Sequence, residues 1–176
     1  MKNKPRIQQV SRGFRFLFTA LFFLIPLFWF MYWLFFNDLP TGVVKFPTAP
    51  EQVLSLQTRI IAFLVNLIPA SVVMFGMYKL VRLFRLYEQA IIFTTENVKY
   101  YRTLGYVCFY WVIAKTLSIP FISAVIVFDT LPEQRSIVAQ FEFPHLSVLI
   151  IGLIILSISW VMDEGRKLED EQAYTV

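Results

Sequence analysis

The chain has 176 residues, of which 57% are apolar and 16% are charged, and its net charge is +4. A soluble domain averages ~45–50% apolar and ~25% charged residues. The composition therefore excludes a disordered chain, a coiled coil and a nucleic-acid-binding domain with a basic face, and it predicts a single domain (residues 1–176) that folds in a lipid bilayer.

The first predicted element is an uncharged apolar run at residues 16–36. A spanning helix needs ~20 mostly apolar residues. A basic stretch precedes the run, as in a signal peptide, but the apolar core is too long and no small-residue cleavage site follows it. We therefore expect an uncleaved first membrane helix.

Three further apolar runs follow, at residues 60–78, 103–128 and 143–162, and Lys115 is the single charge within them. None alternates with a period of two, so strands of a barrel are disfavoured. In hydrocarbon every backbone polar group must be bonded internally, which a helix achieves. The sequence predicts an all-α polytopic membrane protein, a four-transmembrane-helix bundle.

The positions of Lys and Arg predict the orientation, because cytoplasmic loops carry an excess of both. Twelve of the sixteen lie on one side and three on the other. Both termini and the connection at residues 79–102 are therefore expected in the cytoplasm. The twelve are Lys2, Lys4, Arg6, Arg12, Arg15, Lys79, Arg82, Arg85, Lys99, Arg102, Arg166 and Lys167, and the three are Lys45, Arg59 and Arg135.

The cytoplasmic connection is predicted to be a helical hairpin. Residues 78–89 lack Pro and Gly, so the second helix should project two or three turns beyond the bilayer. A sharp turn is expected at residues 92–94, and the third helix is expected to begin near Thr95. A threonine would cap this helix, and Glu96 would lie at the positive end of its dipole. The hairpin is typical of positive-inside topology with interfacial tyrosines; the alternative is a docking surface for a cytoplasmic partner or anionic lipid.

The C-terminal tail, residues 163–176, carries five acidic and two basic residues. We expect it to extend the fourth helix, and its acidic groups could pair with the basic hairpin. The outer connections, at residues 37–59 and 129–142, are too short for a folded domain.

Lys115 is the most unusual residue inside the predicted membrane region. Insertion of a central lysine costs ~2.5–3.5 kcal/mol, so a functional hypothesis is warranted. Lys115 could extend toward the cytoplasm, lose its charge through desolvation, or line a polar cavity with Asn66, Ser118 and Ser157.

Other residues in the spans have simpler expected roles. Proline kinks helices, and glycine allows two helices to approach closely. The single histidine is expected at the outer end of the fourth helix, at the membrane interface. These residues are Pro26, Pro69, Pro120, Gly76, Gly152 and His145.

The inventory of reactive groups argues against an enzyme. One cysteine, Cys108, excludes an intrachain disulfide and a Cys-x-x-Cys relay, and one histidine excludes a metal site built from several His or Cys ligands. The spans hold no paired carboxylates and no known catalytic motif. We expect a protein without enzymatic activity, metal or cofactor.

Two segments resemble a known family. The first contains Phe-Thr-Thr-Glu-Asn-Val at residues 93–98 and Tyr-Arg-Thr-Leu-Gly at residues 101–105, preceded by Arg-Leu-Tyr-Glu at 85–88. The second runs from Met-Asp-Glu-Gly-Arg-Lys-Leu at residues 162–168 through an acidic stretch to Tyr-Thr-Val at residues 174–176. Together they resemble a bacterial four-span membrane family, domain of unknown function 2975 (DUF2975). The resemblance implies that the spans lie in the inner membrane of a bacterium.

The family has no established activity, but its members are commonly encoded beside a small helix-turn-helix regulator. The resemblance thus implies a regulatory, sensor or scaffold protein with that cytoplasmic partner, without direct nucleic-acid binding. The alternative is a small transporter or ion conductor, necessarily a homo-oligomer, built around Lys115, Asn66 and Ser118. The partner-binding candidates are Thr94, Asn97, Arg102, Gly165, Leu168, Glu171, Thr175 and Val176.

Overall fold

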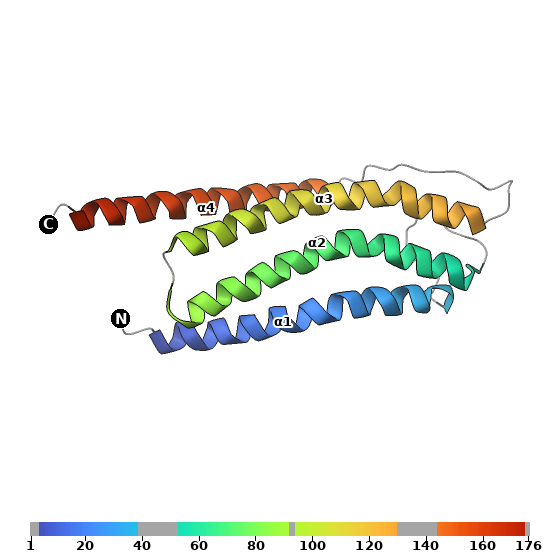
Figure 1. Cartoon of the computed structure of the whole chain (residues 1–176), viewed down its shortest axis with the longest axis horizontal. Coiled ribbons are helices and arrows are strands. Elements are labelled where there is room, and N and C mark those ends of the chain that lie inside the picture. Colours follow the sequence, from blue (N-terminus) through green and yellow to red (C-terminus); the bar gives the residue numbers. More distant parts are fainter. Residues whose placement is uncertain (1–3, 39–52, 92–93, 130–143, 175–176) are drawn as a thin grey trace.

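The computed structural model describes residues 4–38, 53–91, 94–129 and 144–174, which form four long helices and no strand (Figure 1). All four helices are long and apolar enough to cross a membrane, so the prediction of an all-α four-span membrane protein is confirmed. The helices are α1 (Lys4–Leu34), α2 (Leu56–Glu88), α3 (Thr95–Asp129) and α4 (Pro144–Tyr174), with a short 3-10 turn, η1 (Phe36–Asp38), after α1.

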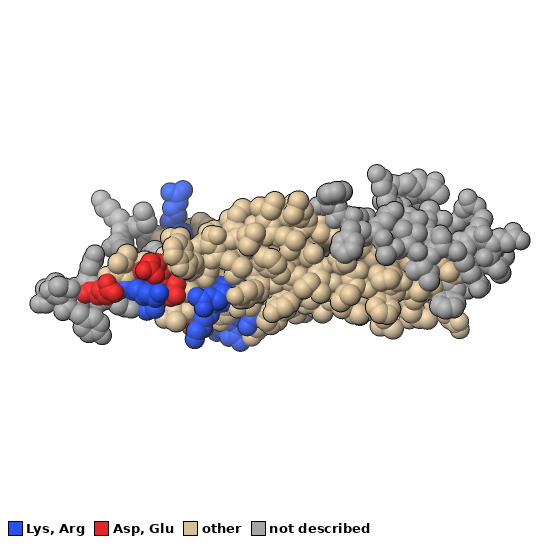
Figure 2. Space-filling model, turned by 90° about the horizontal axis from the view of Figure 1, so that it is seen from above, with Lys and Arg blue, Asp and Glu red and all other residues tan. Residues whose placement is uncertain are grey.

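The helices pack in the order of the sequence, α1 on α2, α2 on α3 and α3 on α4, and each runs opposite to its neighbour. Both ends of the chain and the α2–α3 turn consequently lie at one end of the molecule, which we call the polar end (Figure 1). Figure 2 shows charged side chains gathered there, while the middle of the visible face is uncharged. This distribution fits a chain whose central part is covered by lipid.

The α3–α4 contact depends on two glycines facing each other. A Cβ added to Gly105 would lie 2.6 Å from Leu156 Cδ2, and one added to Gly152 would lie 2.9 Å from Cys108 Cβ. A Cβ on Gly76, in α2, would lie 3.0 Å from Val107 Cγ1. The close-packing roles predicted for Gly76 and Gly152 are confirmed, and Gly105 joins them as the partner of Gly152.

The two glycines hold α4 in an offset position along α3. The His145 ring, at the start of α4, lies 5.7 Å from that of Trp111, near the middle of α3. At the other end the Ser159 hydroxyl donates to the Val98 carbonyl at 3.1 Å. His145 lies at the outer end of α4, as predicted, its exposed fraction is 8%, and α4 begins beside the middle of α3 rather than level with its end.

Opposite the polar end, a core of Trp33, Leu54, Ala62, Ile122 and Ile126 joins the first three helices. The connection into α2 is held by polar contacts there. The Asn37 side chain accepts from the Leu54 backbone N–H at 3.1 Å and donates to the Leu54 carbonyl at 3.0 Å. Three prolines lie inside helices that continue through them: Pro26, Pro69 and Pro120.

The end of α2 is a Schellman motif with alanine where glycine is usual. The Ile91 N–H donates to the Leu86 carbonyl at 3.0 Å, and the Ala90 N–H donates to the Tyr87 carbonyl at 2.9 Å. Ala90 has φ 60°, a left-handed conformation that strains a residue with a Cβ.

We therefore expect Ala90→Gly to raise the free energy of unfolding by about 1 kcal/mol. Heat unfolding in detergent, followed by circular dichroism, measures the shift. The matched control is Ala70→Gly, in the interior of the same helix, which is expected to lower stability by about 1 kcal/mol. Loss of stability in both variants would contradict the assigned strain.

Candidate functional site at the polar end

The turn between α2 and α3 is built around Asn97. The third helix starts at Thr95, as predicted, and the Thr94 hydroxyl caps it by accepting from the Asn97 N–H at 3.4 Å. The Asn97 side chain is 0% exposed, and its Nδ2 donates to the Ile91 carbonyl at 2.9 Å. Asn97 therefore joins the end of α2 to the start of α3, and it has no exposed surface.

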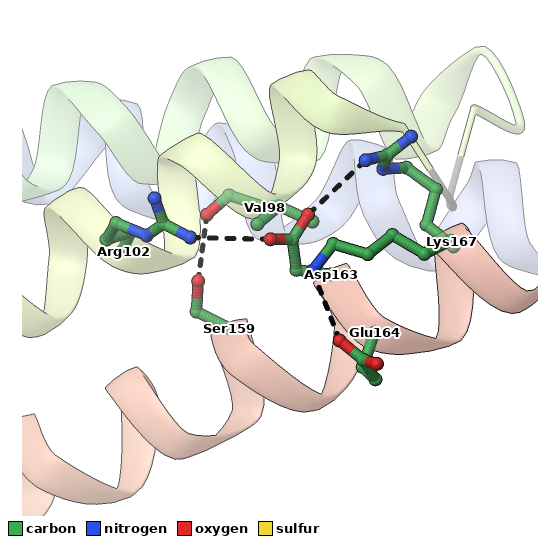
Figure 3. A network of polar contacts seen from close by, with 7 residues as sticks. Val98, Arg102, Ser159, Asp163, Glu164 and Lys167 are labelled. Atoms are coloured by element: carbon green, nitrogen blue, oxygen red, sulfur yellow. Dashed lines mark hydrogen bonds and ion pairs between the residues drawn. The ribbon is translucent and has the colours of Figure 1, made fainter.

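A second polar network joins α3 to the tail (Figure 3). Asp163 lies between two arginines, with Oδ2 at 3.6 Å from Arg102 Nη2 and Oδ1 at 3.5 Å from Arg166 Nη2. The expected pairing of the acidic tail with the basic hairpin is confirmed at this contact. These groups are partly exposed, so the ion pairs fix the direction of α4 more than they add stability.

Beyond Asp163, α4 continues to Tyr174, a further length of about 16 Å. Figure 1 shows this part running past the start of α3. Three of the candidate residues lie on it and are exposed: Gly165, Leu168 and Glu171. Leu168 is an apolar side chain with an exposed fraction of 54% among charged neighbours. The last two candidates, Thr175 and Val176, lie outside the described residues.

The N-terminal part of α1 also lies at the polar end, as its basic residues predicted, but the sequence analysis did not predict its contacts with α2. The Glu88 carboxylate binds Arg12 Nε at 2.9 Å and Arg15 Nη1 at 2.7 Å. Beside these pairs the rings of Phe14 and Phe18 contact Phe84 of α2. The spacing of the two arginines places both on one face of a helix, but it does not indicate their partner on α2.

Among the residues that the structure describes, the three groups that were expected to share a polar cavity with Lys115 each form a hydrogen bond within their own helix. Asn66 and Ser118 are buried, and each donates to a carbonyl of its own helix, at 3.1 Å to Ala62 and 2.7 Å to Ala114. Ser157 donates to the carbonyl four residues before it on α4 and lies on an exposed apolar groove of about 420 Å³ lined by α4 alone. Lys115 is half-buried.

Comparison with known proteins identifies one family model, described as "Protein of unknown function (DUF2975)", which matches residues 47–176. The matched region begins before α2 and includes the turn at Asn97, the Arg102–Asp163 contact and the whole of α4. No curated protein and no solved structure matches the chain.

Proposed function

The chain belongs to the DUF2975 family of membrane proteins of unknown function, and we propose that it acts there as a non-enzymatic regulatory or scaffold protein. Its polar end faces the cytoplasm of a bacterial cell and binds a small helix-turn-helix transcription regulator. The excess of Lys and Arg at this end supports the orientation, because cytoplasmic segments are enriched in both.

The observation that carries the proposal is the extension of α4 beyond α3. The Arg102–Asp163 contact holds its base, and the helix beyond the contact presents Leu168 on a charged, exposed surface. An isolated apolar side chain on a fixed helix can enter a pocket of a partner, while the surrounding charges select the partner's charge pattern. The described C-terminal residues that resemble the family signature therefore lie on one helix within reach of a cytoplasmic protein.

The test is recovery of the regulator with the full chain after crosslinking in the cells that naturally make it. Unsubstituted protein is expected to co-purify with a small helix-turn-helix protein. Leu168→Ala is expected to weaken this binding about tenfold, because the apolar anchor is lost.

Two controls accompany this experiment. Lys167→Ala alters the neighbouring exposed residue, and Lys115→Leu alters the intramembrane lysine; both are expected to leave recovery unchanged. Failure to recover any helix-turn-helix protein with an intact tail would refute the proposal, as would full recovery with Leu168→Ala.

The alternative, a small oligomeric transporter or ion conductor, has less support from the geometry. Asn66 on α2 and Ser118 on α3, two of its proposed polar groups, each donate a hydrogen bond to a backbone carbonyl of their own helix. The groove of α4 that includes Ser157 is otherwise lined by apolar side chains. A conducting path would need polar groups that converge on one space.

A further inference from the structure

An open cavity of about 570 Å³ lies along the start of α3 near the polar end, and α2 contributes one residue to its wall. It is separate from the projecting part of α4, to which the proposed regulator would bind. Charged and hydroxyl-bearing side chains dominate its walls, in contrast to the apolar grooves elsewhere on the helices. They are Lys79, Thr95, Glu96, Lys99, Tyr100 and Thr103.

The position of the cavity along the helices corresponds to the headgroup level of a membrane. Lys79 directly follows the uncharged stretch 60–78 of α2, and Thr103 begins the stretch of α3 in which Lys115 is the only charge before Asp129. The apolar segment of α2 and that of α3 therefore both end at residues that line the cavity, Lys79 and Thr103. In a bilayer, phospholipid phosphates lie where such segments end.

The Lys79 ammonium is held over aromatic rings. Its Nζ lies 4.9 Å from the Phe75 ring centroid, 5.7 Å from that of Tyr78 and 5.8 Å from that of Tyr100. Cation–π attraction stabilises a positive charge without neutralising it. The Lys79 ammonium is therefore positioned in advance, at low entropic cost, to meet an anion.

The charges around the cavity favour an anion. Glu96 is the one carboxylate in its wall, and that carboxylate accepts a hydrogen bond from the Tyr100 hydroxyl at 3.0 Å. In the part of the chain that the structure describes, no carboxylate lies within ion-pair distance of Lys79 or Lys99. A third cation, Arg82, lies outside the wall of the cavity, and its Nε donates to the hydroxyl of Tyr78, the residue before Lys79, at 3.0 Å.

We propose that this cavity binds the phosphate of an anionic phospholipid, with Lys79 and Lys99 as the charged ligands. The acyl chains then extend toward the apolar part of α2, where the Phe75 side chain is half exposed next to Lys79. The lipid would join the ends of α2 and α3 at the polar end and fix the depth of the hairpin in the membrane.

The proposal is tested by titrating the full chain, purified in a neutral detergent, with phosphatidylglycerol and counting bound lipids by native mass spectrometry. Phosphatidylcholine is the zwitterionic comparison, and inorganic phosphate is the competitor. The double variant Lys79→Gln/Lys99→Gln is expected to lower the association constant for phosphatidylglycerol about tenfold. Glu96→Gln is expected to raise it about threefold, because the opposing charge is removed.

The matched control is Arg6→Gln/Lys167→Gln, which removes the same charge from exposed residues at the same end of the molecule. It is expected to change the association constant by less than about twofold. If the association constant for phosphatidylglycerol falls equally in both double variants, the proposal is overturned, because the lipid is then attracted by the overall positive charge and not by this cavity. An unchanged constant in both Lys79→Gln/Lys99→Gln and Glu96→Gln would also overturn it, as would displacement of the lipid by equimolar inorganic phosphate. Unaltered circular dichroism shows that each variant is folded.

Discussion

Gly152→Ala is expected to lower the free energy of unfolding by about 2 kcal/mol, although it adds only one methyl group. That methyl would lie 2.9 Å from Cys108 Cβ and 3.1 Å from the Gly105 carbonyl oxygen. Neither atom belongs to the flexible end of a side chain, so the steric overlap can be relieved only if the backbones of α3 and α4 move apart. Separation would also lengthen the contacts at Ser159 and at the Arg102–Asp163 pair.

The measurement uses the single cysteine of the chain as a reporter. Cys108 lies at the contact, so its labelling by a maleimide during titration with a denaturing detergent follows the opening of α3 from α4. Gly152→Ala is expected to shift labelling to lower denaturant.

The same substitution on the same helix supplies the control. A Cβ on Gly165 meets no atom within 4 Å, so Gly165→Ala is expected to stabilise α4 by about 0.5–1 kcal/mol through helix propensity alone. If both alanine variants label like the unsubstituted protein, the close glycine contact does not hold the helices together.

Asn97→Ala is the second substitution with a large expected effect, a loss of about 2 kcal/mol. It removes the donor to the Ile91 carbonyl at the point where α2 ends and α3 begins, and it leaves a void at a fully buried position. Asn97→Asp should be still less stable at neutral pH, since a carboxylate oxygen would face that carbonyl. The deficit of Asn97→Asp should shrink as the pH is lowered, because a protonated carboxyl group can donate again.

Denaturant unfolding at neutral and acidic pH, followed by circular dichroism, distinguishes these effects. The control is Gln89→Ala in the same turn, where the side chain is exposed and the cap contact uses the backbone N–H. It is expected to change stability by less than about 0.5 kcal/mol. An Asn97→Ala variant as stable as Gln89→Ala would show that Asn97 does not hold the turn.

The candidate site was predictable in part. The Thr94 cap, the start of α3 at Thr95 and the pairing of the tail with the hairpin follow from residue types and spacing close to each helix end. The burial of Asn97 was not predictable, because asparagine is usual in exposed turns and only the approach of Ile91 encloses it. The pairing of Glu88 with Arg12 and Arg15 joins residues more than seventy positions apart, which no local pattern indicates.

By itself the sequence determined the class of protein, the number of helices and their alternating direction, but not the start of α1 at Lys4, twelve residues before the first apolar run. Uninterrupted apolar stretches of sufficient length must be helical in lipid, and four of them return the chain to the side where it began. Only the tertiary structure decided how far each helix is displaced along its neighbour. An apolar helix surface in lipid has little preference for one register, so the offset of α4 depends on Gly105, Gly152 and a few polar contacts between distant residues.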